Sequence, residues 1–176
     1  MDSVTINRAP VLTLWATIVA ERLGFSREEA LTLGKAVAGL NAYSKGKALG
    51  LFKPTPGDVR AQRAAQAKKA GVIHVELLHR AVPVLPTPDG LRAVAKEKPI
   101  EPKSVQRYLT SKFKDALGPV TQAMTELAAS KDAEELSVQA YALYEKFRPA
   151  IPAGEAGWGA AGVLSMSKIR ALTKAG

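Results

Sequence analysis

The sequence predicts a mainly helical protein of the α+β class, in which a helical region with a small β-hairpin is followed by a helical C-terminal part. Helical spacing of apolar residues recurs along most of the chain, whereas the alternation typical of strands is confined to residues 73–95. The 176 residues are 47% hydrophobic and include no cysteine, so the chain is long enough to bury a core without disulfides. We expect two regions, residues 1–98 and 99–176, either separate or joined in one domain.

The first helix is predicted to begin near Asn7–Pro10, since proline is tolerated in a first turn, and to end at Leu23, before Gly24. Its apolar run, residues 9–20, is shorter than the roughly 20 residues that cross a bilayer, so we expect a buried helix and no membrane span. No signal-peptide cleavage pattern follows the run, and the cytoplasm is therefore the expected location.

A second helix is expected from Arg27 to about Tyr43, opened by a capping box of Ser26 and Glu29. Small side chains recur along it every four residues and form a ridge on which another helix can pack closely. The ridge consists of Ala30, Gly34, Ala38 and Ala42. We favour packing of this ridge on the first helix of the same chain. A homodimer through the ridge is the alternative.

Residues 44–57 carry glycine or proline at five positions and predict a loop. Asp58 then caps a third predicted helix, residues 59–70, which has almost no large apolar side chain to bury. After it, the alternation that begins at Ile73 and the turn signal Thr87–Gly90 predict the β-hairpin.

Two further helices are expected in the C-terminal part. A helix opened by Glu101–Pro102 has an apolar face of Val105, Tyr108, Leu109 and Phe113 and a polar face of Lys103, Arg107, Thr110 and Lys114. The next, Asp132–Phe147, packs Leu136, Ala140, Leu143 and Phe147 and has its acids mainly in the first turn. The tail is rich in glycine and proline up to Gly162 and closes with a short basic helix, Ser165–Lys174.

Positive charge is concentrated in two segments of the chain. Residues 35–69 hold eight basic residues against one acid, and residues 92–114 hold seven against two, in a protein of formal net charge +9. Residues 126–145 have a net charge of −4. Such a polarised charge distribution attracts polyanions to one side of a protein, so nucleic acid is the first class of partner to consider.

The stretch from Val19 to Leu33 resembles a helix-turn-helix, with Gly24 at the turn and Ala20 and Ala30 where the helices cross. An ordinary pair of antiparallel helices joined by a glycine turn is the alternative. Glu28 and Glu29 favour that alternative, because they lie where a recognition helix meets phosphates and would repel them.

A winged-helix arrangement agrees better with the charge, because it makes residues 59–70 the recognition helix and the turn Thr87–Gly90 the wing. Arginine and glutamine side chains can each make two hydrogen bonds to a base edge. A solvated, purely structural helix is the alternative for residues 59–70.

The sequence contains no recognisable catalytic, metal or nucleotide motif. It has no phosphate-binding loop of the usual spacing, and its two histidines, His74 and His79, lack a third metal ligand nearby. The adjacent acids Glu134 and Glu135 point to different helix faces and form no acid–base pair. Trp158 is expected to anchor the tail to the core, with base stacking as the alternative. We therefore expect no cofactor and favour a role other than catalysis.

The function expected from the sequence is nucleic-acid binding, DNA in preference to RNA, through phosphate contacts on one basic face. The expected contact residues are Lys45, Lys47, Lys53, Arg60, Gln62, Arg63, Gln66, Lys68, Lys69, Lys103, Arg107 and Lys114. The first alternative is a protein-interaction module whose basic face binds an acidic protein. The second is an enzyme whose cleft is formed by residues distant in sequence.

Overall fold

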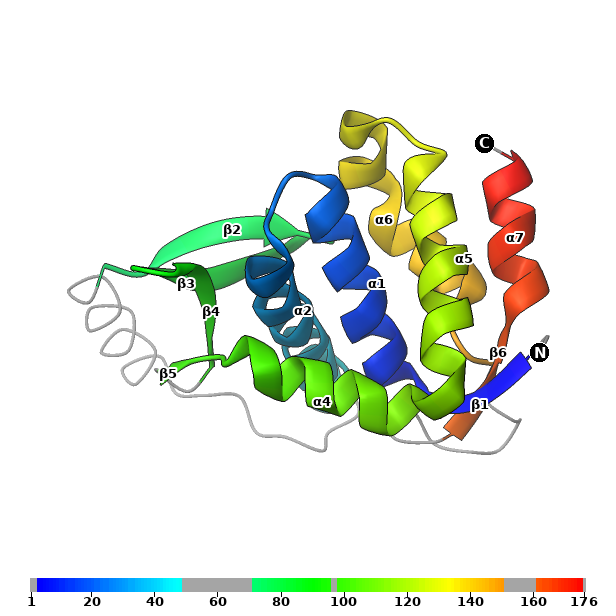
Figure 1. The fold of residues 1–176 in the computed structure, drawn as a ribbon, viewed down its shortest axis with the longest axis horizontal. Coiled ribbons are helices and arrows are strands. Elements are labelled where there is room, and N and C mark those ends of the chain that lie inside the picture. The colour runs from blue at the N-terminus through cyan, green and yellow to red at the C-terminus, as the bar shows by residue number, and fades with distance from the viewer. Residues whose placement is uncertain (1–2, 49–70, 96–97, 151–160, 176) are drawn as a thin grey trace.

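Helices dominate the computed structural model, which describes residues 3–48, 71–95, 98–150 and 161–175. The helices are α1 (Arg8–Arg22), α2 (Arg27–Ala48), α4 (Pro102–Phe113), α5 (Leu117–Ala129), α6 (Ala133–Phe147) and α7 (Met166–Ala175), with a short 3-10 helix at Lys114–Ala116. Two small antiparallel sheets lie at opposite ends of the helical body (Figure 1). The mainly helical α+β class expected from the sequence is confirmed.

The larger sheet follows chain order, β2 (Ile73–Leu77), β3 (Arg80–Thr87), β4 (Gly90–Ala95) and β5 (Lys98–Pro99). The hairpin expected around Thr87–Gly90 is present, with Val84 opposite Ala93. A second hairpin precedes it and turns at Leu78 and His79, which both have positive φ, 50° and 62°. Two-residue hairpin turns need this geometry but usually take glycine or asparagine, so Leu78 and His79 are not recognisable as a turn from their residue types.

The smaller sheet joins the two ends of the described chain. Strand β1 (Ser3–Asn7) pairs with β6 (Ala161–Ser165), and Ser3 lies opposite Ser165. The sequence analysis expected neither strand. Residues 161–165 were assigned to the tail, yet their alternating burial places Leu164 in the core, where its apolar side chain is removed from water.

Helix α1 forms the centre of the core. Every residue from Pro10 to Ala20 is buried, as expected for a helix that is apolar on all sides. The indole N–H of Trp15 donates to the carbonyl of Ala140 (2.9 Å), and its ring meets Phe147 edge-on at 5.3 Å between centroids. Because α1 also packs on α2, α4 and α5, buried residues from both sides of residue 98 share one hydrophobic core.

The expected helix pair is confirmed by the contact between α1 and α2. A Cβ added to Gly34 would lie 2.5 Å from the carbonyl oxygen of Thr13 and 2.9 Å from the amide nitrogen of Thr17. The small-residue ridge therefore brings the two backbones together within the chain, as the favoured interpretation required. Helix α1 ends as expected, because Gly24 takes a φ of +111°, which other residues rarely adopt.

Some boundaries differ from the expected ones. Helix α2 continues to Ala48, so residues 44–48 of the loop expected at 44–57 are helical, and the rest of that stretch lies outside the described residues. Gly46 costs a helix about 1 kcal/mol but does not end it. The expected third helix, residues 59–70, lies outside the described residues. Helix α5 was not expected. Both expected C-terminal helices, α4 and α6, are present, and the Asp132 side chain caps α6 by accepting from the Glu135 amide (2.8 Å).

Candidate nucleic-acid interface

Helix α4 carries the part of the expected interface that the structure describes. Its amphipathic spacing buries Val105, Leu109 and Phe113 in the core. Lys103 and Arg107 lie one turn apart on the opposite, exposed face, and Lys114 follows at the end of the helix, also exposed. Burial of the apolar face thus fixes the direction in which Lys103 and Arg107 point, while Lys114 follows α4 as the first residue of the 3-10 helix. We call Lys103, Arg107 and Lys114 the α4 stripe.

A second group of cations surrounds the ring of Tyr108, at the edge of the apolar face of α4. The Lys35 ammonium, from α2, is 3.6 Å from the ring centre, and that of Lys112 is 6.0 Å from it. Contact of a cation with an aromatic face is favourable. Burial, and then the charge of Lys112, lower the pKa of Lys35 from its usual value, and burial raises the pKa of Tyr108. We call Lys35, Tyr108 and Lys112 the Tyr108 cluster.

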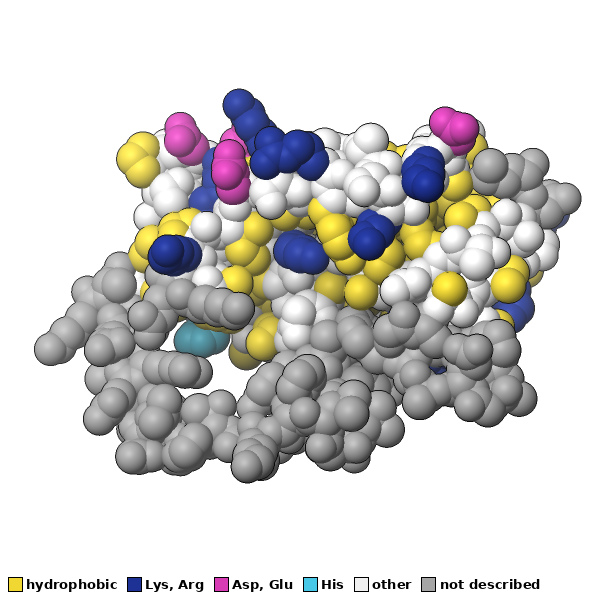
Figure 2. Space-filling view, turned by 90° about the horizontal axis from the view of Figure 1, so that it is seen from below, with side chains coloured by type: hydrophobic (Ala, Val, Ile, Leu, Met, Phe, Trp, Pro, Cys, Tyr) yellow, Lys and Arg dark blue, Asp and Glu magenta, His cyan; other side chains and the backbone are white. Residues whose placement is uncertain are grey.

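Neither group is neutralised within the part of the chain that the structure describes. The ion pairs there are Arg27–Glu21, Arg92–Glu28 and Lys131–Glu135, and they involve no residue of the stripe or the cluster. Figure 2 views the side of the molecule on which α4 lies. Lysine and arginine side chains are spread over this face with hydrophobic side chains between them, and the acidic side chains lie near one margin.

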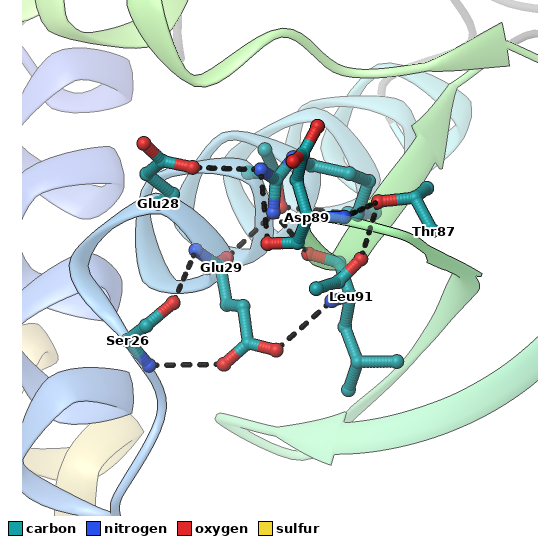
Figure 3. A network of polar contacts seen from close by, with 10 residues as sticks. Ser26, Glu28, Glu29, Thr87, Asp89 and Leu91 are labelled. Atoms are coloured by element: carbon teal, nitrogen blue, oxygen red, sulfur yellow. Dashed lines mark hydrogen bonds and ion pairs between the residues drawn. The ribbon is translucent and has the colours of Figure 1, made fainter.

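Arg92 belongs to the same basic segment of the sequence but is not available to a ligand. Its side chain is only 9% exposed and pairs with Glu28 at 2.7 Å. It also donates to the carbonyl of Leu91 at 2.9 Å. The ion pair with Glu28 attaches β4 to the N-terminal turn of α2 and compensates the positive charge of Arg92 within the protein (Figure 3).

Glu29 completes this attachment. Its carboxylate accepts from the Ser26 amide (3.0 Å) while the Ser26 hydroxyl accepts from the Glu29 amide (3.2 Å), which confirms the expected capping box. The second carboxylate oxygen accepts from the Leu91 amide at 2.9 Å. These hydrogen bonds, above all that of Leu91, lower the pKa of Glu29 (Figure 3). Both acids that weakened the helix-turn-helix interpretation therefore have structural roles.

The surroundings of α2 favour the ordinary helix pair over the helix-turn-helix. From Ala30 to Ala38 all residues except Lys35 are buried, so this stretch presents no continuous face to a DNA groove. The expected wing tip, Thr87–Gly90, lies against α2, because a Cβ on Gly90 would contact the Glu29 carboxylate at 3.2 Å. Beside it lies an open pocket of about 580 Å³, whose charged lining consists of the acids Glu28, Asp89 and Glu101 and the cations Arg92 and Lys103.

The structure brings together only part of the residues that the sequence analysis selected. Lys103 and Arg107 lie exposed on α4, and Lys114 is exposed directly after it. Lys45 and Lys47 belong to the last turn of α2, where the backbone alone is described. The remaining selected residues, Lys53, Arg60, Gln62, Arg63, Gln66, Lys68 and Lys69, lie outside the described residues.

Sequence reasoning missed the Tyr108 cluster. Lys35 and Lys112 were counted in the basic segments, but nothing local joins them, because they are 77 positions apart and meet only when α2 packs on α4. Tyr108 was assigned to the apolar face of its helix, and it is indeed half-buried there. Tyr108 lies at the edge of that face, one helical turn before Lys112, and this spacing was the signal in the sequence that could have indicated a contact between its ring and a cation.

The described residues show no site for a metal and no helix that could cross a membrane. His74 and His79 are exposed, and across the described ranges no three histidine, aspartate or glutamate side chains are grouped as metal ligands. None of the described helices has both the length and the apolar composition that a bilayer requires. Comparisons with protein-family models, with curated proteins and with solved structures found no match to this chain.

Proposed function

We propose that the chain binds nucleic acid, DNA in preference to RNA, and that α4 supplies phosphate contacts. The observation that carries the proposal is the exposed α4 stripe, together with the Tyr108 cluster on another side of the same helix, with no carboxylate paired to either among the described residues. Lysine and arginine on a rigid helix are the usual donors to backbone phosphates, and such contacts position a protein on DNA without reading its sequence.

The length of the stripe fits a run of phosphates. From Lys103 to Lys114 the chain advances 11 residues, which at about 1.5 Å per helical residue spans roughly 16 Å. A duplex of that length carries about nine or ten phosphate charges, since one charge occurs for about every 1.7 Å of axis. A helix contacts only the phosphates on the side of the duplex that it faces, so a part of these charges is enough for the three cations of the stripe.

Salt dependence tests the proposal. If about six phosphates are engaged in all, the logarithm of the binding constant should fall with the logarithm of salt concentration with a slope near −5 on duplex DNA. Fluorescence anisotropy with a labelled duplex, a single strand and an RNA hairpin, each at several salt concentrations, gives the slope and ranks the three probes. Tighter binding of the duplex than of the RNA supports DNA as the partner.

The alternative of an acidic protein partner makes a different prediction for the same experiment. Absence of binding to every probe at low salt, or a slope near zero, contradicts the nucleic-acid proposal. A pull-down with the intact chain as bait should then recover an acidic protein, and its binding should weaken when Lys103 and Arg107 are replaced.

A further inference from the structure

A third group of cations lies away from α4, where α1 begins and α6 ends. Arg8 is the first residue of α1, Arg148 directly follows α6, and Arg80 is the first residue of β3. Both helix ends adjoin the sheet formed by β1 and β6, so the fold brings them to the same side of the molecule (Figure 1).

A hydrogen bond fixes the side chain of Arg8 beside the end of α6. The Nε of Arg8 donates to the carbonyl of Pro149 (3.0 Å), which puts this guanidinium next to the residue after Arg148. The hydroxyl of Tyr144 approaches the carbonyl of Arg8 at 3.5 Å.

The buried side chain of Asn41 links Arg80 to the same region. Its Oδ1 accepts from Nη2 of Arg80 (3.0 Å) and from the hydroxyl of Tyr141 (3.0 Å). Tyr141 in turn lies beside Tyr144, with 5.8 Å between the ring centroids. Arg80, Asn41 and Tyr141 therefore form one hydrogen-bonded group, and the packing of Tyr141 on Tyr144 places this group near the start of α1.

Like charges act on each other in this region. Burial, and next the charge of Arg148, lower the pKa of Arg8 below its ordinary value. The ion pairs of the described residues all lie elsewhere, and Glu145, the acid on the neighbouring turn of α6, is exposed and pairs with none of these arginines. The negative end of the α6 dipole favours Arg148, but the positive end of α1 adds to the charge of Arg8.

Many guanidinium donors are unused. A guanidinium has five N–H donors. Among the described residues, Arg8 and Arg80 each use one of them in a hydrogen bond, and the side chain of Arg148 uses none. All three side chains are half-buried, so they are partly removed from water and still accessible to a small ligand.

We propose that Arg8 and Arg148 bind a phosphate group. Two planar guanidinium groups can each make paired hydrogen bonds to phosphate oxygens, and a dianion offsets their mutual repulsion. The ligand is either free phosphate or the terminal phosphate of a nucleic-acid strand. This site is separate from the α4 stripe and does not depend on it.

The test is a titration of the intact chain with inorganic phosphate at constant ionic strength, followed by phosphorus NMR or calorimetry. Arg148→Gln should weaken phosphate binding at least tenfold. Arg148→Lys, which keeps the charge and loses the planar pair of donors, should weaken it less and also protects the test against misfolding of the first variant. The matched control is Arg170→Gln, which removes an exposed arginine from α7 and should bind phosphate like the wild type.

A second arm identifies the source of the phosphate. The wild type is compared on two oligonucleotides that differ only in a 5′-phosphate. Tighter binding of the phosphorylated strand, with that preference lost in Arg148→Gln, supports a site whose ligand is a strand end. If the wild type binds inorganic phosphate and Arg148→Gln binds it more weakly, the result supports a site whose ligand is free phosphate. If the wild type binds neither, or if Arg148→Gln binds both unchanged, the proposal is wrong. Binding of internal duplex DNA through α4 should be the same in all these variants.

Discussion

Gly34→Ala and Gly39→Ala place the same methyl group at two positions of α2 and should change stability in opposite directions. At Gly34 the new Cβ would overlap the hydroxyl of Thr17 and lie 2.5 Å from the carbonyl oxygen of Thr13. Ordinary contact begins near 3.4 Å. Backbone atoms cannot rotate away, so α1 and α2 must separate by several tenths of an ångström. We expect a loss of about 3 kcal/mol in the free energy of unfolding, at the upper end of the usual cost of overpacking.

Gly39 is the matched control. It lies on the exposed side of the same helix, and a Cβ there meets nothing within 4 Å. Alanine lowers the conformational entropy of the unfolded chain and favours the helix, so Gly39→Ala should stabilise the protein by about 0.5–1 kcal/mol. The difference between the two variants therefore isolates the packing cost from helix propensity.

Urea unfolding followed by circular dichroism measures both changes. A loss of about 3 kcal/mol corresponds to a fall of roughly 6–12 °C in the melting temperature for a chain of this size. If Gly34→Ala lies within about 0.5 kcal/mol of the wild type, the close approach of α1 and α2 is wrong. A similar loss of stability in Gly39→Ala would show that the effect is not specific to the contact between α1 and α2.

Three further changes test other parts of the fold. Ala38→Leu, at a buried position of the same ridge, should cost about 1–3 kcal/mol by overpacking, with no change in mass by light scattering before the protein unfolds. In Glu29→Gln the free energy of unfolding should fall less steeply with acid than in the wild type. The pKa of Glu29 in the folded protein lies below the usual 4.5, so the ionised carboxylate stabilises the fold above pH 4.5. This contribution disappears as the pH falls through the folded pKa, and the variant lacks it at every pH. An unchanged acid limb in that variant would contradict the role given to the hydrogen bonds from Ser26 and Leu91. His79→Gly should stabilise the protein by about 1 kcal/mol in urea unfolding, because glycine adopts the positive φ of His79 without strain. A destabilised variant would show that the histidine side chain is needed at this position.

Local signals in the sequence predicted the elements whose ends are fixed locally. Gly24 ends α1, Ser26 and Glu29 cap α2, and Asp132 caps α6, and each of these acts within a few residues. The sheet of β1 and β6 could not be predicted this way. Its partners are separated by most of the chain and are defined only once the helices between them have packed.

The same distinction applies to the candidate interface. The exposure of Lys103 and Arg107 follows from the helical spacing of their own segment, and the prediction is confirmed. Arg92 also belongs to a basic segment, but its charge is compensated by Glu28, which is 64 positions away in the chain. Lys35 became a candidate only through its contact with Tyr108 on another helix. Net charge along the sequence therefore indicates a class of partner, whereas tertiary contacts decide which cations remain available.

The most direct test of nucleic-acid binding through α4 compares two double variants of equal charge. Lys103→Ala with Arg107→Ala removes two cations from the α4 stripe, and Lys168→Ala with Arg170→Ala removes one lysine and one arginine from the exposed side of α7. Salt-dependent anisotropy on one duplex should show the slope of the α4 variant falling in magnitude from about 5 to about 3, because each lost phosphate contact removes about one unit. The α7 variant should keep the wild-type slope and bind within twofold of it. Equal weakening by both variants, or by neither, would contradict an interface on α4.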